Sequence, residues 1–127
     1  LRGEMVLSHV NQHSKKLKPF DQDWFLGDWG TNAEGKCTDF NLITSIPAES
    51  NLVGLELNRN QICNYSVNSK CNWLFIYALN GEIRCTIDSK EYNLKNGDLL
   101  VIQNPEILNI MFKGIENSAW VLTELTV

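Results

Sequence analysis

Residues able to bind a small molecule gather in two short runs of the sequence. Phe25, Asp28 and Trp29 belong to the first run, and Asp39 and Asn41 belong to the second. If the second run is a strand, Asp39 and Asn41 share one face, where they need solvent or a polar ligand, because both types are unfavourable in strand interiors. Two interpretations stay open: an outward-facing strand surface, or a polar floor at a barrel mouth. Trp29 is either a core side chain or a wall against which a ligand stacks.

The sequence offers few groups for metal or covalent chemistry. Its only histidines are His9 and His13, which excludes a His-based metal site in the second half of the chain. The two flank Asn11 and Gln12, where we expect a hairpin turn, so we predict that both are surface residues. Motifs for a nucleophilic serine, a phosphate-binding loop or a dinucleotide fold are missing. We therefore predict no metal, no cofactor and no covalent catalysis.

Composition limits the partners of the chain. With 127 residues, 43% hydrophobic and 20% charged, it is predicted to form a packed globular protein. A net charge of -4 makes nucleic acid and anionic membranes poor partners. No apolar run approaches the roughly 20 residues that span a bilayer. The four cysteines lack the spacing of zinc knuckles, so we expect buried free thiols and a cytoplasmic location.

Short apolar runs between turn residues predict an all-β fold. Turn residues recur at Asn80-Gly81, Asp88-Ser89, Asn96-Gly97 and Asn104-Pro105. Many short strands at such spacing are typical of a sandwich or barrel. The predicted strands span residues 5–10, 14–17, 24–26, 38–44, 52–57, 61–67, 73–79, 83–88, 90–94, 99–103, 107–112 and 119–126.

An internal repeat suggests two related units. Residues 1–5 parallel residues 79–83 with an offset of 78 (79 − 1), and residues 16–19 parallel residues 93–96 with an offset of 77 (94 − 17). The second copy has 28 residues, 52–79, leading to its Gly-Glu turn, whereas the first has only two. We therefore expect that the first unit lacks its beginning and exposes unpaired strand edges.

Several motifs together resemble one known family. A turn at Gly97-Asp98 resembles the centre of cupin domains, where the glycine allows a positive φ and the aspartate bonds backbone N–H groups. An L-x-P-F segment at 17–20, F-x-G-x-W at 25–29 and D-F-N-L at 39–42 are similar to the HutD/Ves family of bicupins. The resemblance implies a cupin-like double-stranded β-helix, a jelly-roll barrel. Residues 1–44 would be the C-terminal part of a first cupin unit with its connecting strand, and 45–127 the second unit.

The resemblance also implies a function. HutD-like proteins are associated with histidine utilisation, which suggests a metal-free protein that binds a small polar metabolite in an accessory or regulatory role. Asp39, Asn41 and Trp29 carry over as pocket residues, with Phe25 and Asp28 beside them. Two alternatives stay open: a metal-independent isomerase or hydrolase with Asp39 or Asp28 as general base, or a structural module that forms a homodimer through its sheet edges.

Overall fold

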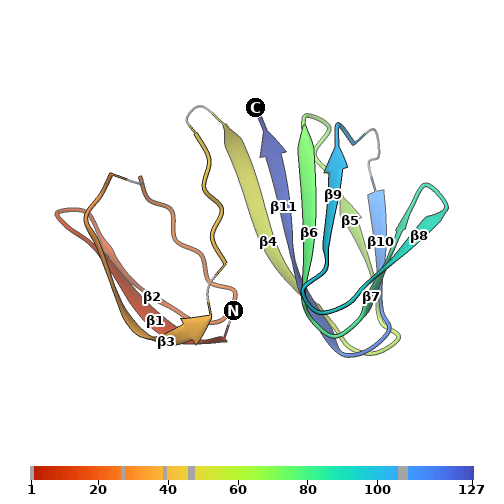
Figure 1. The fold of residues 1–127 in the computed structure, drawn as a ribbon, viewed down its shortest axis with the longest axis horizontal. Helices are drawn as coiled ribbons and strands as arrows, with labels where there is room; N and C mark the ends of the chain where they lie inside the picture. The colour runs from red at the N-terminus through yellow and green to blue at the C-terminus, as the bar shows by residue number, and fades with distance from the viewer. Residues whose placement is uncertain (1, 27, 39, 46–47, 106–108) are drawn as a thin grey trace. The chain divides into compact units, whose positions relative to one another are not determined.

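The computed structural model comprises residues 1–127 and describes all of them except 1, 27, 39, 46–47 and 106–108 (Figure 1). The described residues form strands, turns and loops, with no helix among them. The chain divides into two compact units, Leu1–Ile43 and Thr44–Val127, which are described separately below. The predicted all-β fold is confirmed.

The first unit is a three-stranded antiparallel sheet with the order β2-β1-β3. Its strands are β1 (Arg2–His9), β2 (Ser14–Leu17) and β3 (Thr31–Thr38). Along β1, side chains alternate between the two faces, and Leu7 and His9 both lie on the buried face. Leu17 of β2 is also buried, opposite Met5 in the register of the hairpin. His9 therefore continues the inward alternation that begins with apolar residues.

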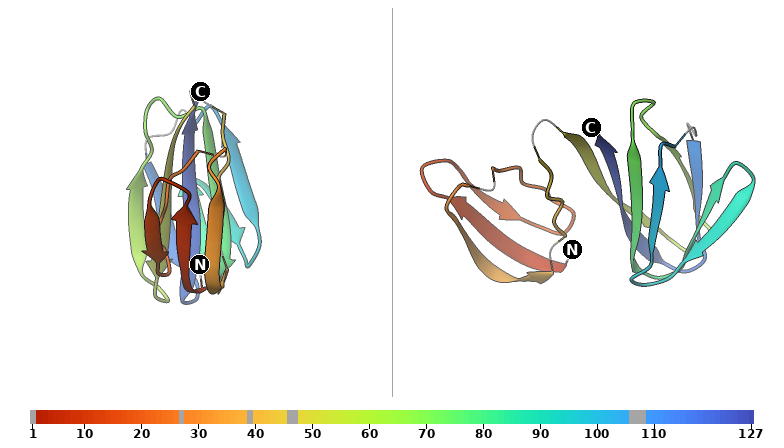
Figure 2. Two further views of the ribbon diagram at one scale, coloured as in Figure 1. Left: turned by 90° about the vertical axis from the view of Figure 1, so that its left-hand side faces the viewer. Right: turned by 45° about the horizontal axis from the view of Figure 1, so that its top comes forward.

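The second unit consists of two four-stranded antiparallel sheets, ordered β5-β10-β7-β8 and β4-β11-β6-β9. Figures 1 and 2 show the two sheets facing each other across the core. This is the layout of a jelly-roll sandwich. The strands are β4 (Glu49–Leu57), β5 (Ile62–Ser66), β6 (Trp73–Asn80), β7 (Ile83–Ile87), β8 (Lys90–Leu94), β9 (Leu99–Gln103), β10 (Asn109–Gly114) and β11 (Ser118–Thr126).

Alternating residues of both sheets fill the interior of the second unit. On β6, Leu74, Ile76 and Ala78 are buried, and their neighbours along the strand are only partly so. The rings of Phe112 on β10 and Trp120 on β11 meet between the sheets, with centroids 4.8 Å apart. Burial of such large apolar side chains, at about 25 cal/mol per Å², is the main force that holds two sheets together.

Two of the predicted strands are wrong. Residues 24–26 form no strand. The predicted strand 38–44 is also wrong, because the strand in this part of the chain is β3, which ends at Thr38. β3 has a weak intrinsic preference for strand, but it pairs with β1 at eight successive positions, and this backbone pairing overrides propensity. Gly35 permits the close approach, because a Cβ there would lie 2.4 Å from the carbonyl oxygen of Glu4. The first two residues of the predicted strand 107–112 lie outside the described residues, and β10 includes residues 109–112.

The turn at Gly97-Asp98 is confirmed in detail. Gly97 has a φ of 83°, in the left-handed region that favours glycine. Asp98 accepts a hydrogen bond at Oδ2 from the backbone N–H of Lys95, 2.9 Å away. The turn thereby leads the chain into β9, which pairs with β6.

Candidate functional site

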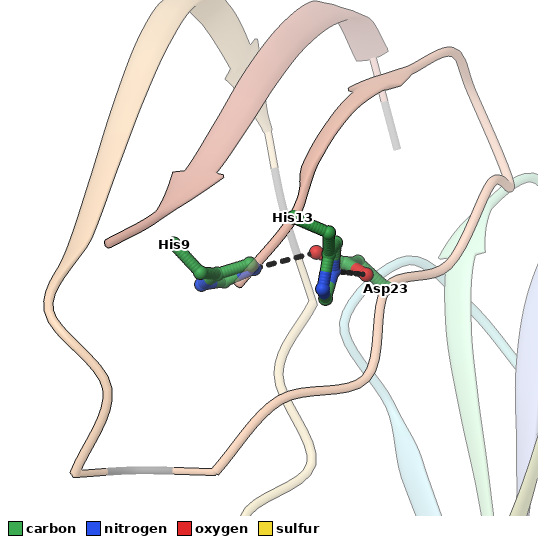
Figure 3. Close-up of side chains that lie close together, drawn as sticks. All are labelled: His9, His13 and Asp23. Atoms are coloured by element: carbon green, nitrogen blue, oxygen red, sulfur yellow. Dashed lines mark hydrogen bonds and ion pairs between the residues drawn. The ribbon is translucent and has the colours of Figure 1, made fainter. Parts of the chain in front are cut away.

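Three side chains of the first unit converge on one point, His9, His13 and Asp23 (Figure 3). The Nε2 atom of His9 lies 2.7 Å from Oδ2 of Asp23, and Nε2 of His13 lies 2.7 Å from Oδ1. The side chain of His9 is fully buried and that of Asp23 is 6% exposed, whereas that of His13 is 40% exposed. The cluster therefore has one closed side and one side open to solvent.

A tight hairpin places the two imidazoles side by side. The backbone N–H of His9 bonds the carbonyl of His13 at 2.8 Å, which closes a loop over residues 10–12. Asn11 occupies the left-handed region at φ 59°, as such short hairpin loops require. The two ring centroids are consequently 4.6 Å apart. The predicted hairpin is confirmed, but the prediction that His9 is a surface residue is wrong.

Asp23 lies in the segment that follows β2. A turn from Lys18 to Asp21 redirects the chain: the backbone N–H of Asp21 bonds the carbonyl of Lys18 at 2.9 Å. The side chain of Asp21 closes the same turn by accepting from the backbone N–H of Lys18 at 3.0 Å. The chain then passes alongside the hairpin, where the Nζ of Lys15 donates to the carbonyl of Gln22. Asp23 follows directly and faces both histidines.

A second layer of polar groups fixes the ring of His9. Thr31 is its cross-strand partner on β3, and the Thr31 hydroxyl lies 2.8 Å from Nδ1 of His9. The same hydroxyl donates to the carbonyl oxygen of Trp29 at 3.3 Å. Both nitrogen atoms of the buried ring therefore have partners, as a buried polar group requires.

Aromatic rings surround the cluster. The ring of Phe25 lies with its centroid 4.5 Å from that of His9, and Trp29 makes edge contacts with His9 at 5.7 Å and with His13 at 5.9 Å. The adjoining apolar side chains are exposed to solvent, with Trp24 61%, Phe25 45% and Leu26 45% exposed. An exposed run of large apolar side chains next to buried polar groups is typical of a binding surface.

Opposing effects act on the Asp23 carboxyl group. Burial on its own raises the pKa, but the hydrogen bonds from His9 and His13 and their positive charge outweigh it, so the pKa lies below its ordinary value. Asp23 is therefore held as a carboxylate at neutral pH. It can accept hydrogen bonds or bind a cation, but it is not suited to donating a proton.

The residues predicted from the sequence are only partly brought together. Trp29 and Phe25 lie in contact with the histidines. Asp28 and Asn41 are exposed, and Asn41 is not in a strand, so the shared strand face proposed for Asp39 and Asn41 is wrong for Asn41. Asp39 lies outside the described residues. The sequence analysis missed Asp23 and Thr31, and it missed His9 although the two-residue alternation from Leu7 marks that position as buried.

Comparison with known sequences matches residues 1–120 to the family described as HutD. This chain belongs to the HutD family. The HutD-family chain has no match among curated proteins. Among solved structures it is similar to PA5104, a conserved protein of unknown function from Pseudomonas aeruginosa PAO1, with a TM-score of 0.73 and 14% identity. That match covers 98% of this chain and 66% of the other.

Two cupins are also similar to the HutD-family chain. An RmlC-like cupin from Shewanella frigidimarina matches with a TM-score of 0.50 and 15% identity, covering 62% of this chain and 68% of that chain. An RmlC-like cupin from Desulfovibrio desulfuricans matches with a TM-score of 0.50 and 16% identity, covering 70% and 96%. Identities this low show the fold alone. They confirm the predicted cupin-like jelly roll, while the assignment of residues 1–44 to an incomplete first unit stays a prediction.

Other expectations concern the thiols and the membrane. The structure has four free cysteines: Cys71 and Cys85 are buried, Cys63 is partly buried and Cys37 is exposed. The expectation of buried free thiols is confirmed for Cys71 and Cys85 and is wrong for Cys37. Among the described residues of the HutD-family chain, no helix has the length and apolar character needed to cross a bilayer.

Proposed function

We propose that this HutD-family chain binds a small polar metabolite at His9, His13 and Asp23, in an accessory or regulatory role in histidine utilisation. The observation that carries the proposal is the convergence of two imidazoles on one nearly buried carboxylate beside exposed aromatic side chains. Pockets for small molecules combine an apolar wall with a few fixed polar groups in this way.

The closed side of the cluster supplies a rigid base. His9 is held from both ring nitrogens, by Asp23 and by Thr31, so its orientation is set before any ligand arrives. A group that is already ordered loses little conformational entropy on binding. Fixed polar atoms of this kind favour recognition of a specific ligand over loose association.

The open side supplies the point of contact. The His13 side chain is 40% exposed, and its ring makes an edge contact with the ring of Trp29, a partly buried residue. A polar ligand reaches His13 from solvent and covers the exposed ring of Phe25 as it binds. A ligand with a carboxylate group suits this side, because an imidazole N–H donates to a carboxylate and both oxygens of Asp23 are already engaged by the two histidines.

Calorimetric titration of the full chain in EDTA tests the proposal. The compounds are L-histidine and the carboxylate intermediates of its breakdown, tested against the wild type, His13→Ala and Gln12→Ala. Gln12 is an exposed residue of the same hairpin loop and serves as the matched control. We expect one compound to bind, His13→Ala to weaken it at least about tenfold, or roughly 1.4 kcal/mol, and Gln12→Ala to leave it unchanged. Absence of binding by every compound, or equal binding by His13→Ala, contradicts the proposal.

A further inference from the structure

We propose that His9, His13 and Asp23 form a site for one divalent transition-metal ion of the zinc class. Their potential ligand atoms, one from each residue, all lie within 4.8 Å of one another. Two imidazoles and one carboxylate are the protein ligands of many zinc sites that keep a further position for water or substrate. The inference goes beyond the proposed function, because a metal can bind here without a metabolite and a metabolite without a metal.

The hydrogen bonds around His9 present one ring nitrogen to such an ion. The Thr31 hydroxyl has a single proton, and it donates that proton to the carbonyl of Trp29. Thr31 must then accept a hydrogen bond from His9, which places a proton on Nδ1. In this arrangement Nε2 either carries a second proton or offers its lone pair to a cation next to Asp23.

This arrangement matches the surroundings of metal-binding histidines. Such a histidine usually donates its second ring N–H to an oxygen acceptor, which fixes the tautomer and the direction of the ring. Here the acceptor is Thr31, anchored in turn on the backbone of Trp29. The cluster therefore has both a set of candidate ligands and a supporting hydrogen-bond chain behind the buried ligand.

Only a small rearrangement is needed to bind the ion. Metal–ligand bonds of about 2.0–2.1 Å at tetrahedral angles place neighbouring ligand atoms roughly 3.3 Å apart. The two nitrogen–oxygen distances are now 2.7 Å and must open, while the widest separation among the candidate ligand atoms, up to 4.8 Å, must shorten. His13 lies beside a short hairpin loop and is partly exposed, so it can make most of this adjustment. Its open side also leaves room for a fourth ligand from solvent.

Charge favours occupation of the site by a cation. The side chain of Asp23 is only 6% exposed and supplies an oxygen ligand, and the two imidazoles that face it supply nitrogen ligands. Lys15 is the cation that the structure places next to this segment, and its Nζ is bonded to the carbonyl of Gln22.

The test uses the full chain, stripped with EDTA and desalted, and titrated with Co²⁺ and then Zn²⁺. We expect one equivalent to bind, with visible cobalt absorption of a four- or five-coordinate site and displacement of cobalt by zinc. His13→Gln changes a partly exposed residue, so the fold survives, and we expect at least about a hundredfold loss of affinity. Thr31→Val keeps the side-chain shape but removes the hydroxyl, and should cost about 10–100-fold. Gln12→Ala is the matched control and should bind as the wild type does.

The competing explanation is metal capture by the free thiols, of which Cys37 is exposed. Thiolate ligands give cobalt an intense near-ultraviolet band, which should be absent, and Cys37→Ser should bind normally. A thiolate band, or affinity unchanged in both His13→Gln and Thr31→Val, overturns the metal site. Repeating the metabolite titration with and without one equivalent of Zn²⁺ separates the two proposals: metabolite binding in EDTA with no metal uptake retains the proposed function and rejects the metal site.

Discussion

The two units bury different kinds of side chain. The core of the second unit is made of apolar residues from both sheets, among them Ile76, Phe112 and Trp120. Its buried carboxylate, Glu124, accepts hydrogen bonds from the hydroxyl of Tyr65 and from the backbone N–H of Asn68, 2.8 Å away. Burial, together with Glu124, raises the pKa of Tyr65. Tyr65 is partly buried and Asn68 is exposed, and among the described residues Glu124 belongs to no cluster of three metal-ligating side chains.

In the first unit, by contrast, buried histidine and aspartate side chains lie beside few buried apolar ones. Leu7 and Leu17 are its buried aliphatic side chains among the described residues, and His9 lies beside them. Asp23 is shared by two histidines, of which one is open to solvent. The comparison shows that burial alone does not mark a functional group. Asp23 differs from Glu124 in its partners, which are two imidazoles that can themselves bind a ligand or a metal ion, one of them open to solvent.

The largest effect is expected in the apolar core of the second unit. Phe112→Ala removes a fully buried ring that packs against Trp120, and should lower the free energy of unfolding by about 3–5 kcal/mol. Urea denaturation followed by tryptophan fluorescence measures the loss. The control is Met111→Ala on the adjacent position of β10, which is 38% exposed and should cost far less. Similar losses for the two variants would contradict the assignment of the core to this face.

A smaller and local effect is expected in the first unit. Asp23→Ala leaves the buried ring of His9 without one of its partners, which costs about 1–3 kcal/mol. Amide hydrogen exchange should therefore accelerate in β1 and β3, with no change in β6 and β11. Glu4→Ala is the control. It removes an exposed ion pair with Lys16, so the free energy of opening that governs exchange should change by less than about 1 kcal/mol. Faster exchange throughout the chain would show that the cluster stabilises more than its own unit.

The smallest effect concerns pH and the thiol of Cys85. Burial raises the pKa of Cys85 to about 12 from an ordinary value of 9.0, so the folded state holds its proton more tightly than the unfolded state does. The stabilisation is complete below pH 9 and is lost as pH rises from there towards 12. The wild type should lose up to about 1.4 kcal/mol per pH unit in this range from this group. Urea denaturation at pH 8, 9 and 10 should show a shallower decline for Cys85→Ala, and parallel declines would reject the effect.

Local chemistry of the sequence determined most of the second unit. Alternating apolar residues predicted β6 and β7, because the two-residue period of a strand sends every second side chain into the core. Turn residues predicted the Gly97-Asp98 turn, where a positive φ and a side-chain acceptor are both local properties. In the first half of the chain, the motifs at 17–20, 25–29 and 39–42 predicted the HutD family, and Phe25 and Trp29 of the second motif were among the candidate binding residues.

The cluster in the first unit depends on contacts between distant parts of the chain. Asp23 is 14 residues from His9 and Thr31 is 22 residues from it, so their meeting depends on the path of the intervening chain and on the register of β1 with β3. No local pattern specifies that register, since the residues of β3 favour strand weakly and follow the backbone hydrogen bonds that β1 provides. The sequence supplies the side chains, but the path of the intervening chain brings Asp23 to the two histidines, and the pairing of β1 with β3 brings Thr31 to His9.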